Sequence, residues 1–316
     1  MPMTALPALE RLEDLTRLLR AADGFAPLVE SLKAGRSGTV DGAWGSSAAL
    51  ATAALGQEVP TTLLIVLAHP RDTDGWAEDV ASFAGVRPVV FPAWENLPTA
   101  ETVLDDLAAR RLRLLKQLQG PEPPRFLLTT MQALIQPVPE LARLRESRRA
   151  LRTGDQVDMD ELARWLVDHG YQHADAVELP GEFSRRGGIL DVFSPDAEAP
   201  YRMEFFGDEV DSIRQFAPHT QRSLGQLTAV EITAANVEHW TPAGSDGDGQ
   251  AGAARLAGHL CDYLPAGAWV VLVEPEELHE QGKLYLERVP DVCGLFSVPG
   301  VFQQLLRLPS VTVTAL

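Results

Sequence analysis

Short apolar runs alternate with helical patterns between residues 61 and 130, and this alternation constrains the fold more than any other feature. The apolar runs are TTLLIVLA at 61–68, VRPVVFPAW at 86–94 and RFLLTT at 125–130. Such an order predicts a parallel sheet covered by helices. A further apolar run followed by a helical pattern, WVVLVEPEELHEQGKLYLERV, returns at 269–289. We therefore expect one α/β domain that is interrupted by an insertion.

The charge balance limits the partners that the chain can bind directly. The 316 residues carry 44 acidic and 27 basic side chains, a net charge of −17, so duplex DNA is not an expected ligand. Two cysteines, Cys261 and Cys293, suit a reducing compartment, and the seven histidines show no metal-ligand spacing. No run of about 18 apolar residues could span a membrane. We expect a cytoplasmic protein, or part of one, without a metal site.

Residues 41–50, DGAWGSSAAL, lie between a strand-like run and an Ala-rich helical run, where an α/β fold places phosphate. A working phosphate loop closes with Gly-Lys-Ser/Thr, in which Lys meets the β- and γ-phosphates and the hydroxyl holds magnesium. Ala48 and Ala49 occupy the Lys and Ser/Thr positions and can do neither. The stretch is either an ordinary turn or a degenerate, inactive phosphate loop made of Gly42, Gly45, Ser46, Ser47, Ala48 and Ala49.

The pattern changes near residue 135, where short strands and turns begin to dominate. Asp158 precedes an amphipathic helix and has Glu161 three residues on, which is a helix-start signal. We expect residues 135–218 to form an inserted α+β domain with antiparallel strands. Residues 1–134 and 219–316 are then expected to be the two parts of the α/β domain.

Three further segments are assigned from composition. GDE at 207–209 is expected to be a hairpin turn, and no convincing magnesium-binding acid follows an apolar strand elsewhere. SDGDGQAGA at 245–253 is expected to be a flexible loop. RLRESRRALR at 143–152 is the densest basic run and could touch nucleic acid, but its acidic neighbours favour a solvated face.

The stretch YRMEFF at 201–206 has the period of a strand. One face, which we expect to be the core face, carries Tyr201, Met203 and Phe205. The other carries Arg202, Glu204 and Phe206. Arg185 and Arg186 precede a glycine pair that allows a sharp turn. Arginine and aromatic side chains are typical interface anchors, although composition alone also fits a solvated hairpin with incidental charge pairs.

Two motifs carry a family resemblance. GEFSRRGGILDVF and YRMEFFGDEVDSI, with TQRS at 220–223, resemble the second domain shared by bacterial transcription-repair coupling factors (the Mfd family) and the excision-repair protein UvrB. FPAWENLP and RFLLTT resemble the first domain of the coupling factors. The resemblance covers most of residues 40–235 and is closer to the coupling factors than to UvrB.

The resemblance implies a UvrB-like module, in which a degenerate, helicase-like phosphate-loop domain carries an inserted domain that binds UvrA. The UvrA-binding residues that it implies are Arg185, Arg186, Arg202, Glu204 and Phe206. It favours an inherited, inactive phosphate loop over a chance turn, so no cofactor is expected in this chain. ATP, magnesium, RNA polymerase and DNA would meet other parts of the full-length protein. FPAWENLP and the following helix leave no room for the damage-probing hairpin of UvrB.

We therefore expect a non-catalytic module that recruits UvrA and links RNA polymerase stalled at DNA damage to nucleotide excision repair. The alternatives are a UvrB-type nucleotide-dependent helicase fragment and an autoinhibitory structural module. Replacing Arg186 or Arg202 with Ala is expected to weaken UvrA binding without loss of stability, because exposed charges contribute little to folding. Replacing Tyr201 or Phe205 with Ala is expected to lower stability first.

Overall fold

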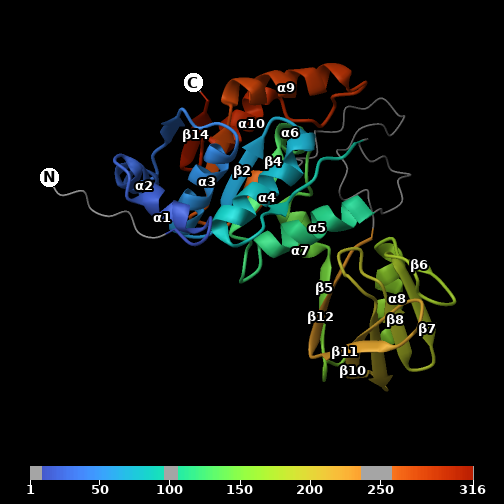
Figure 1. The fold of residues 1–316 in the computed structure, drawn as a ribbon. Coiled ribbons are helices and arrows are strands. Elements are labelled where there is room, and N and C mark those ends of the chain that lie inside the picture. The colour runs from blue at the N-terminus through green and yellow to red at the C-terminus, as the bar shows by residue number, and fades with distance from the viewer. Residues whose placement is uncertain (1–8, 96–105, 236–257, 316) are drawn as a thin grey trace. The chain divides into compact units, whose positions relative to one another are not determined.

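The computed structural model describes residues 9–95, 106–235 and 258–315, and the chain divides into two compact units (Figure 1). The first unit consists of Met1–Glu95, Lys116–Pro137 and His259–Leu316. The second consists of Asn96–Leu115 and Val138–Gly258. An inserted unit interrupts the first one, which confirms the fold class that the sequence predicts.

A six-stranded sheet forms the centre of the first unit, and all its neighbouring strands are parallel. In spatial order the strands are β1 (Gly38–Asp41), β14 (Ser310–Thr314), β13 (Trp269–Val273), β2 (Leu63–Leu67), β4 (Phe126–Thr130) and β3 (Val89–Val90). The predicted parallel sheet is therefore confirmed. The two C-terminal strands lie between β1 and β2, so the last part of the chain completes this sheet.

Helices flank the sheet and bury both of its faces. The helices of this unit are α1 (Asp14–Arg20), α2 (Phe25–Lys33), α3 (Ser46–Glu58), α4 (Thr73–Ala84), α6 (Met131–Ile135), α9 (Pro275–Arg288) and α10 (Val298–Leu305), with the short helical turns Pro70–Asp72 and Leu260–Tyr263. Leu63, Ile65 and Leu67 of β2 pack in one cluster with residues of α3 and α4. Leu64 and Val66 point to the opposite face and are equally buried. Burial on both faces explains the unbroken apolar run of this strand.

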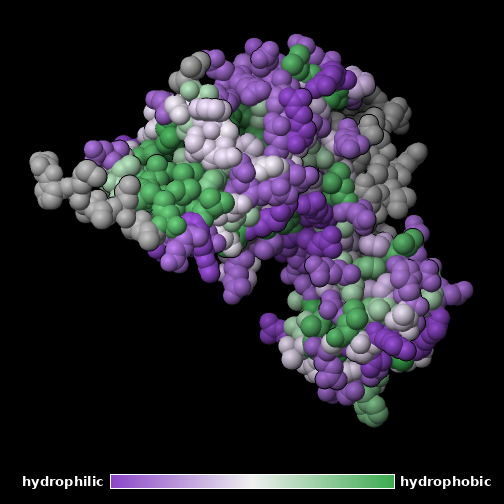
Figure 2. Space-filling view, viewed as in Figure 1, coloured by the Kyte–Doolittle hydropathy of each residue, from purple (hydrophilic) through white to green (hydrophobic). Residues whose placement is uncertain are grey.

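Hydrophobic side chains also reach the surface of the first unit. In the view of Figure 2 they gather over α1 and α3, whereas hydrophilic side chains prevail over α9. Leu9 and Leu12, just before α1, are among the exposed apolar residues. None of the helices that the structure describes has the length and hydropathy of a membrane span.

The second unit contains a six-stranded sheet that is antiparallel except at one edge. In spatial order its strands are β11 (Ser223–Leu227), β10 (Glu209–Phe216), β9 (Tyr201–Phe206), β8 (Ile189–Val192), β7 (Glu182–Arg186) and β6 (Gln172–His173). A second ladder pairs β5 (Arg148–Arg152) with β12 (Ala229–Thr233). Helix α8 (Met159–Asp168) packs on the larger sheet through Leu162 and Leu166.

Helix α8 begins where the sequence predicts. The Asp158 side chain accepts hydrogen bonds from the backbone N–H groups of Asp160 and Glu161, which satisfies two donors of the first turn. These bonds lower the pKa of the Asp158 carboxyl below its ordinary value. Two more helices, α5 (Asp106–Leu118) and α7 (Leu141–Glu146), lie wholly or mostly in the second unit.

Strands β11 and β12, which follow residue 218, belong to the second unit. The expected boundary at 218 falls between β10 and β11, which pair with each other, and β12 pairs with β5 some 80 residues earlier in the chain. Residues 207–208 form the turn of the β9–β10 hairpin, as predicted, with φ of 63° at Gly207. The flexible loop expected at 245–253 lies outside the described residues, as does the segment 96–105 that follows FPAWE.

The basic run at 143–152 forms α7 and β5. Arg148 pairs with Glu231 of β12 at 3.4 Å, and Arg149 pairs with Glu161 of α8 at 3.3 Å. Both guanidinium groups therefore face carboxylates within the unit, but the Arg148 side chain is only 13% exposed, so the expected solvated face does not hold at this residue.

Candidate functional site

Strand β9 separates a core face from a polar face. Met203 is fully buried, and the partly buried Tyr201 and Phe205 pack in the same cluster beneath α8. Arg202, Glu204 and Phe206 alternate to the other side, and Phe206 is 84% exposed. The division of YRMEFF into two faces is therefore as predicted.

The register of the neighbouring strands decides which arginine joins this polar face. Arg186 pairs with Ile189 across the β7–β8 hairpin, and Ile189 pairs with Glu204 of β9. Paired residues share a face, so Arg186 lies on the side of Glu204 and Arg202. Arg185 lies on the opposite side, where it forms an ion pair with Asp160 of α8. The structure thus separates the two arginines that the sequence left together.

The glycine pair makes this register possible. Gly187 has φ of 58°, a conformation that L-residues rarely adopt. At Gly188 a Cβ atom would lie 2.9 Å from the carbonyl oxygen of Phe205, so a larger residue would displace β9. A two-residue turn at 187–188 places Arg186 opposite Ile189 and thereby sets the polar face.

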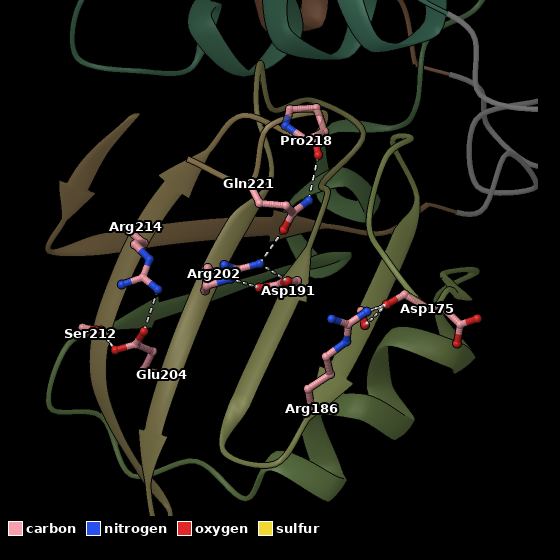
Figure 3. A network of polar contacts seen from close by, with 10 residues as sticks. Asp175, Arg186, Asp191, Arg202, Glu204, Ser212, Arg214, Pro218 and Gln221 are labelled. Carbon is pink, nitrogen blue, oxygen red and sulfur yellow. Dashed lines mark hydrogen bonds and ion pairs between the residues drawn. The ribbon is translucent and has the colours of Figure 1, made fainter. Parts of the chain in front are cut away.

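Arg202 is firmly held within the polar face (Figure 3). Its Nε and Nη2 atoms donate to the two carboxylate oxygens of Asp191, each at 2.7 Å. Nη2 also donates to Oε1 of Gln221 at 2.7 Å, and the guanidinium carbon lies 4.4 Å from the centre of the Phe216 ring. The hydrogen bonds to Asp191 raise the pKa of Arg202 above its ordinary value. The side chains of Arg202 and Asp191 are only 18% and 11% exposed, so this pair is not a solvated one.

Glu204 is held in a similar way by two residues of β10. Its Oε1 atom pairs with Nη2 of Arg214 at 2.7 Å, and its Oε2 atom accepts a hydrogen bond from Oγ of Ser212 at 3.0 Å. Sequence analysis missed Arg214 and Ser212, although both belong to the strand that pairs with β9. The period of two along EVDSIRQF was the available signal.

The loop at residues 42–45 joins β1 to α3, as the phosphate-loop outline predicts. Gly42 and Gly45 have φ of 74° and 55°, which explains both glycines. Oγ of Ser47 accepts the Trp44 N–H at 2.9 Å. Oγ of Ser46 donates to the Asp79 carboxylate at 2.8 Å. Ala48 and Ala49 are buried in the core cluster, so these two positions present no polar group.

An acidic residue does follow an apolar strand of the parallel sheet. Glu274 comes directly after β13, and sequence analysis missed it although WVVLVE contains the signal. Only β14 separates β13 from β1, so Glu274 and the phosphate-like loop are about 10 Å apart across the sheet. The backbone of Glu274 is left-handed, and its carboxylate accepts the Ala315 N–H at 2.7 Å. This acid is therefore engaged by the chain itself.

The described residues contain no group of three His, Cys, Asp or Glu side chains placed to hold a metal ion. Cys261 and Cys293 are free thiols, and burial raises the pKa of Cys261 to about 12. The polar face of the second unit thus remains the strongest candidate site.

Comparison with known proteins bears directly on this face. The family model of the UvrB interaction domain matches residues 150–237, which include all the strands from β6 to β12. This part of the chain is therefore similar to a UvrB interaction domain. It is also 36% identical to a transcription-repair-coupling factor from Myxococcus xanthus over 225 residues, or 68% of this chain. The corresponding protein from Bacillus subtilis is 29% identical over 224 residues, or 70% of the chain.

A similar match extends to mycobacteria. The transcription-repair-coupling factor of Mycobacterium bovis is 34% identical over 190 residues, which is 58% of this chain. The UvrB interaction domain and these relatives together confirm the resemblance to the UvrB-like module of the coupling factors. The aligned part spans only about a fifth of the relatives' own length, 19% of the proteins from Bacillus and Myxococcus.

Proposed function

We propose that the second unit is a UvrA-docking module of a transcription-repair coupling factor, and that the polar face of β7, β8 and β9 is its docking surface. The observation that carries this proposal is the meeting of Arg186, Arg202, Glu204 and Phe206 on one face inside a UvrB interaction domain. In the full-length protein this module would link RNA polymerase stalled at damage to nucleotide excision repair.

The chemistry of the face suits a protein partner. Phe206 is a large aromatic side chain that is 84% exposed at the end of β9. Exposure of its ring to water is unfavourable, and burial of the ring in an interface would be favourable. Arginines beside it supply planar donors for partner carboxylates. The face also contains acidic groups, which would repel the phosphates of nucleic acid and so favour protein over DNA.

We further propose that the first unit does not hydrolyse nucleotide. Ala48 and Ala49 replace the ammonium and hydroxyl groups that a working loop directs at phosphate and magnesium. The Asp79 carboxylate lies at the start of α3, where a working loop would bind phosphate. Its negative charge would repel a phosphate there. The translocase activity, and the contacts to DNA and RNA polymerase, would then belong to other parts of the full-length protein.

Calorimetric titration of this chain with UvrA tests the docking proposal. We expect Arg186→Ala and Phe206→Ala each to weaken binding at least about tenfold, since loss of an interface anchor costs about 2 kcal/mol or more. Arg87→Ala removes an exposed charge from the first unit and should bind like the wild type. Wild-type affinity in both face variants, with unchanged melting, would place the docking surface elsewhere.

Thermal melting with and without magnesium-ATP tests the second part. A specific ligand at about 100 times its dissociation constant adds about 2.7 kcal/mol of stability. We expect no shift of the melting temperature and no phosphate release. A reproducible shift of that size would contradict the proposal for the loop.

A further inference from the structure

The two charged residues of β9 are each held from both sides before any partner arrives. Asp191 and Gln221 hold the Arg202 guanidinium, and Ser212 and Arg214 hold the Glu204 carboxylate (Figure 3). We infer that Gln221 and Arg214 are positioning residues of the docking face, which fix Arg202 and Glu204 in the geometry that the partner meets. This inference rests on the proposed docking function and adds two residues to it.

The hydrogen bonds of Arg202 within the unit leave some of its N–H groups unused. A guanidinium has five N–H groups. Asp191 takes one from Nε and one from Nη2, and Gln221 takes a hydrogen bond from Nη2 as well. The Nη1 group is then the part of Arg202 that a partner can engage. Because Nε and Nη2 already form hydrogen bonds, the position of Nη1 is fixed before binding. Binding then costs little side-chain conformational entropy at Arg202.

Gln221 connects this arginine to the turn between β10 and β11. Its Oε1 atom accepts from Arg202, and its Nε2 atom donates to the Pro218 carbonyl oxygen at 2.7 Å. Its φ is 59°, and among the described residues only one other non-glycine residue, Glu274, has a positive φ. Glycine would adopt this backbone conformation at lower cost. A glycine at position 221 therefore removes both side-chain hydrogen bonds while the turn keeps its backbone conformation.

Arg186 differs from Arg202 in its charge balance. Among the described contacts it donates to the backbone carbonyl of Asp175, and it forms no ion pair. Arg202 and Arg214 each face a carboxylate, so the positive charge that the face leaves uncompensated belongs to Arg186. A partner group opposite Arg186 should therefore be a carboxylate, and Arg186 should carry most of the salt dependence of binding.

Gln221→Gly in the full 316-residue chain tests the positioning role, with UvrA titration and thermal melting as readouts. Loss of a hydrogen bond that fixes Arg202 should weaken UvrA binding about three- to tenfold. The melting temperature should change little, because the backbone strain that glycine relieves offsets the loss of the two side-chain hydrogen bonds. Arg214→Gln should weaken binding to a similar extent, and Arg87→Ala should not. If both variants bind like the wild type, the positioning role is overturned.

A spectroscopic measurement keeps the result independent of UvrA. In nuclear magnetic resonance spectra of the free chain, the Arg202 guanidinium should rotate slowly about its Nε–Cζ bond, and Gln221→Gly should speed up this rotation. Fast rotation in the wild type would overturn the inference even if binding fell. If Arg186→Ala weakens binding while Gln221→Gly and Arg214→Gln do not, the docking function stands and the positioning role fails. If the wild type does not bind UvrA, both fail.

Discussion

Arg202 is the counter-ion of a buried carboxylate, and on the proposed docking face it would also offer a charge to the partner. Asp191 is 11% exposed in its side chain and receives two hydrogen bonds from Arg202. The expectation that Arg202→Ala leaves stability unchanged treated the arginine as an exposed charge. The geometry contradicts that assumption, because removal of the guanidinium leaves Asp191 buried without its counter-ion.

We therefore predict that Arg202→Ala lowers the free energy of unfolding by about 2–3 kcal/mol, since truncating one member of a buried charge pair leaves the other unsatisfied. Arg186→Ala, which breaks no ion pair among the described residues, should change it by less than about 0.5 kcal/mol. Urea unfolding of the two variants measures the difference. Equal stability of both would show that Asp191 finds other partners when Arg202 is absent.

His259 should make the first unit sensitive to mild acid. Burial lowers the pKa of this histidine to about 4, from an ordinary value of 6.5, so the folded chain keeps the ring neutral. As the pH falls below 6.5, His259 becomes protonated in the unfolded chain but stays neutral in the folded chain. The free energy of unfolding therefore decreases between pH 6.5 and about pH 4. From pH 7 to pH 5 we expect a loss of about 2 kcal/mol from this residue.

His259→Asn isolates that contribution. In the wild type, Nδ1 of His259 accepts the Cys261 N–H, and an Asn oxygen can take over this helix-capping bond. The variant should be less stable at pH 7, because it loses the ring contact with Phe296, but it should lose less stability at pH 5. Urea unfolding of the wild type and the variant at pH 7 and pH 5 measures the four free energies of unfolding. The same pH dependence in both proteins would assign the acid sensitivity to other groups.

At the scale of elements, helix α3 contacts strand β4 at a glycine, Gly56, which packs against the ring of Phe126. A Cβ atom at Gly56 of α3 would lie 2.0 Å from Cε1 of Phe126 and 2.2 Å from its Cζ atom. We predict that Gly56→Ala destabilises the chain by about 1–3 kcal/mol through overpacking, despite the better helix propensity of alanine. Gly75→Ala in α4 is the matched control, because a Cβ there meets nothing within 4 Å.

Gly75→Ala should stabilise the chain by up to about 1 kcal/mol. Phe126→Leu should rescue part of the loss caused by Gly56→Ala, because the shorter side chain leaves room for the new methyl group. Thermal melts of the single and double variants measure both effects. A stabilising Gly56→Ala would mean that α3 can shift away from the sheet at little cost.

The elements that depend on local pattern could be predicted from the sequence, and their partners could not. The run TTLLIVLA predicts β2 because burial on both faces demands an unbroken apolar strand, and Asp158 predicts the start of α8 because its side chain caps that helix. The β5–β12 ladder joins segments about 80 residues apart, and the residue pattern of neither segment indicates which strand it pairs with. For this reason the segments of β11 and β12 were expected in the α/β domain, whereas β13 and β14 do lie there.

The candidate site divides in the same way. Alternation along β9 predicts that Arg202, Glu204 and Phe206 share a face, because the period of two is a property of one strand. The choice between Arg185 and Arg186 depends on the register across the turn at 187–188, which the glycine pair indicates but does not prove. The contacts of Arg202 with Asp191 and Gln221 join three chain segments, so only the folded unit reveals them.

At the scale of the whole molecule, the first unit is built from distant parts of the chain. Strands β13 and β14, from the last 50 residues, lie between β1 and β2, where β14 pairs with β1 and β13 pairs with β2. Without them β1 has no described strand partner, and β2 retains β4 alone. Every described strand of the second unit, in contrast, pairs with another strand of that unit.

This difference predicts the behaviour of a chain that ends at Gly258. Because the central strands of the parallel sheet are missing, buried residues of β2 such as Leu64 and Ile65 lose their neighbours in β13, and the first unit should not fold. The second unit retains both of its sheets, so the amide groups of β8, β9 and β10 should remain protected from hydrogen exchange. Exchange measured by mass spectrometry, with the full chain as the control, distinguishes the two units. Protection of β2 and β4 at full-chain level in the shortened protein would show that the sheet forms without its C-terminal strands, and loss of protection in β9 would show that the second unit depends on the first.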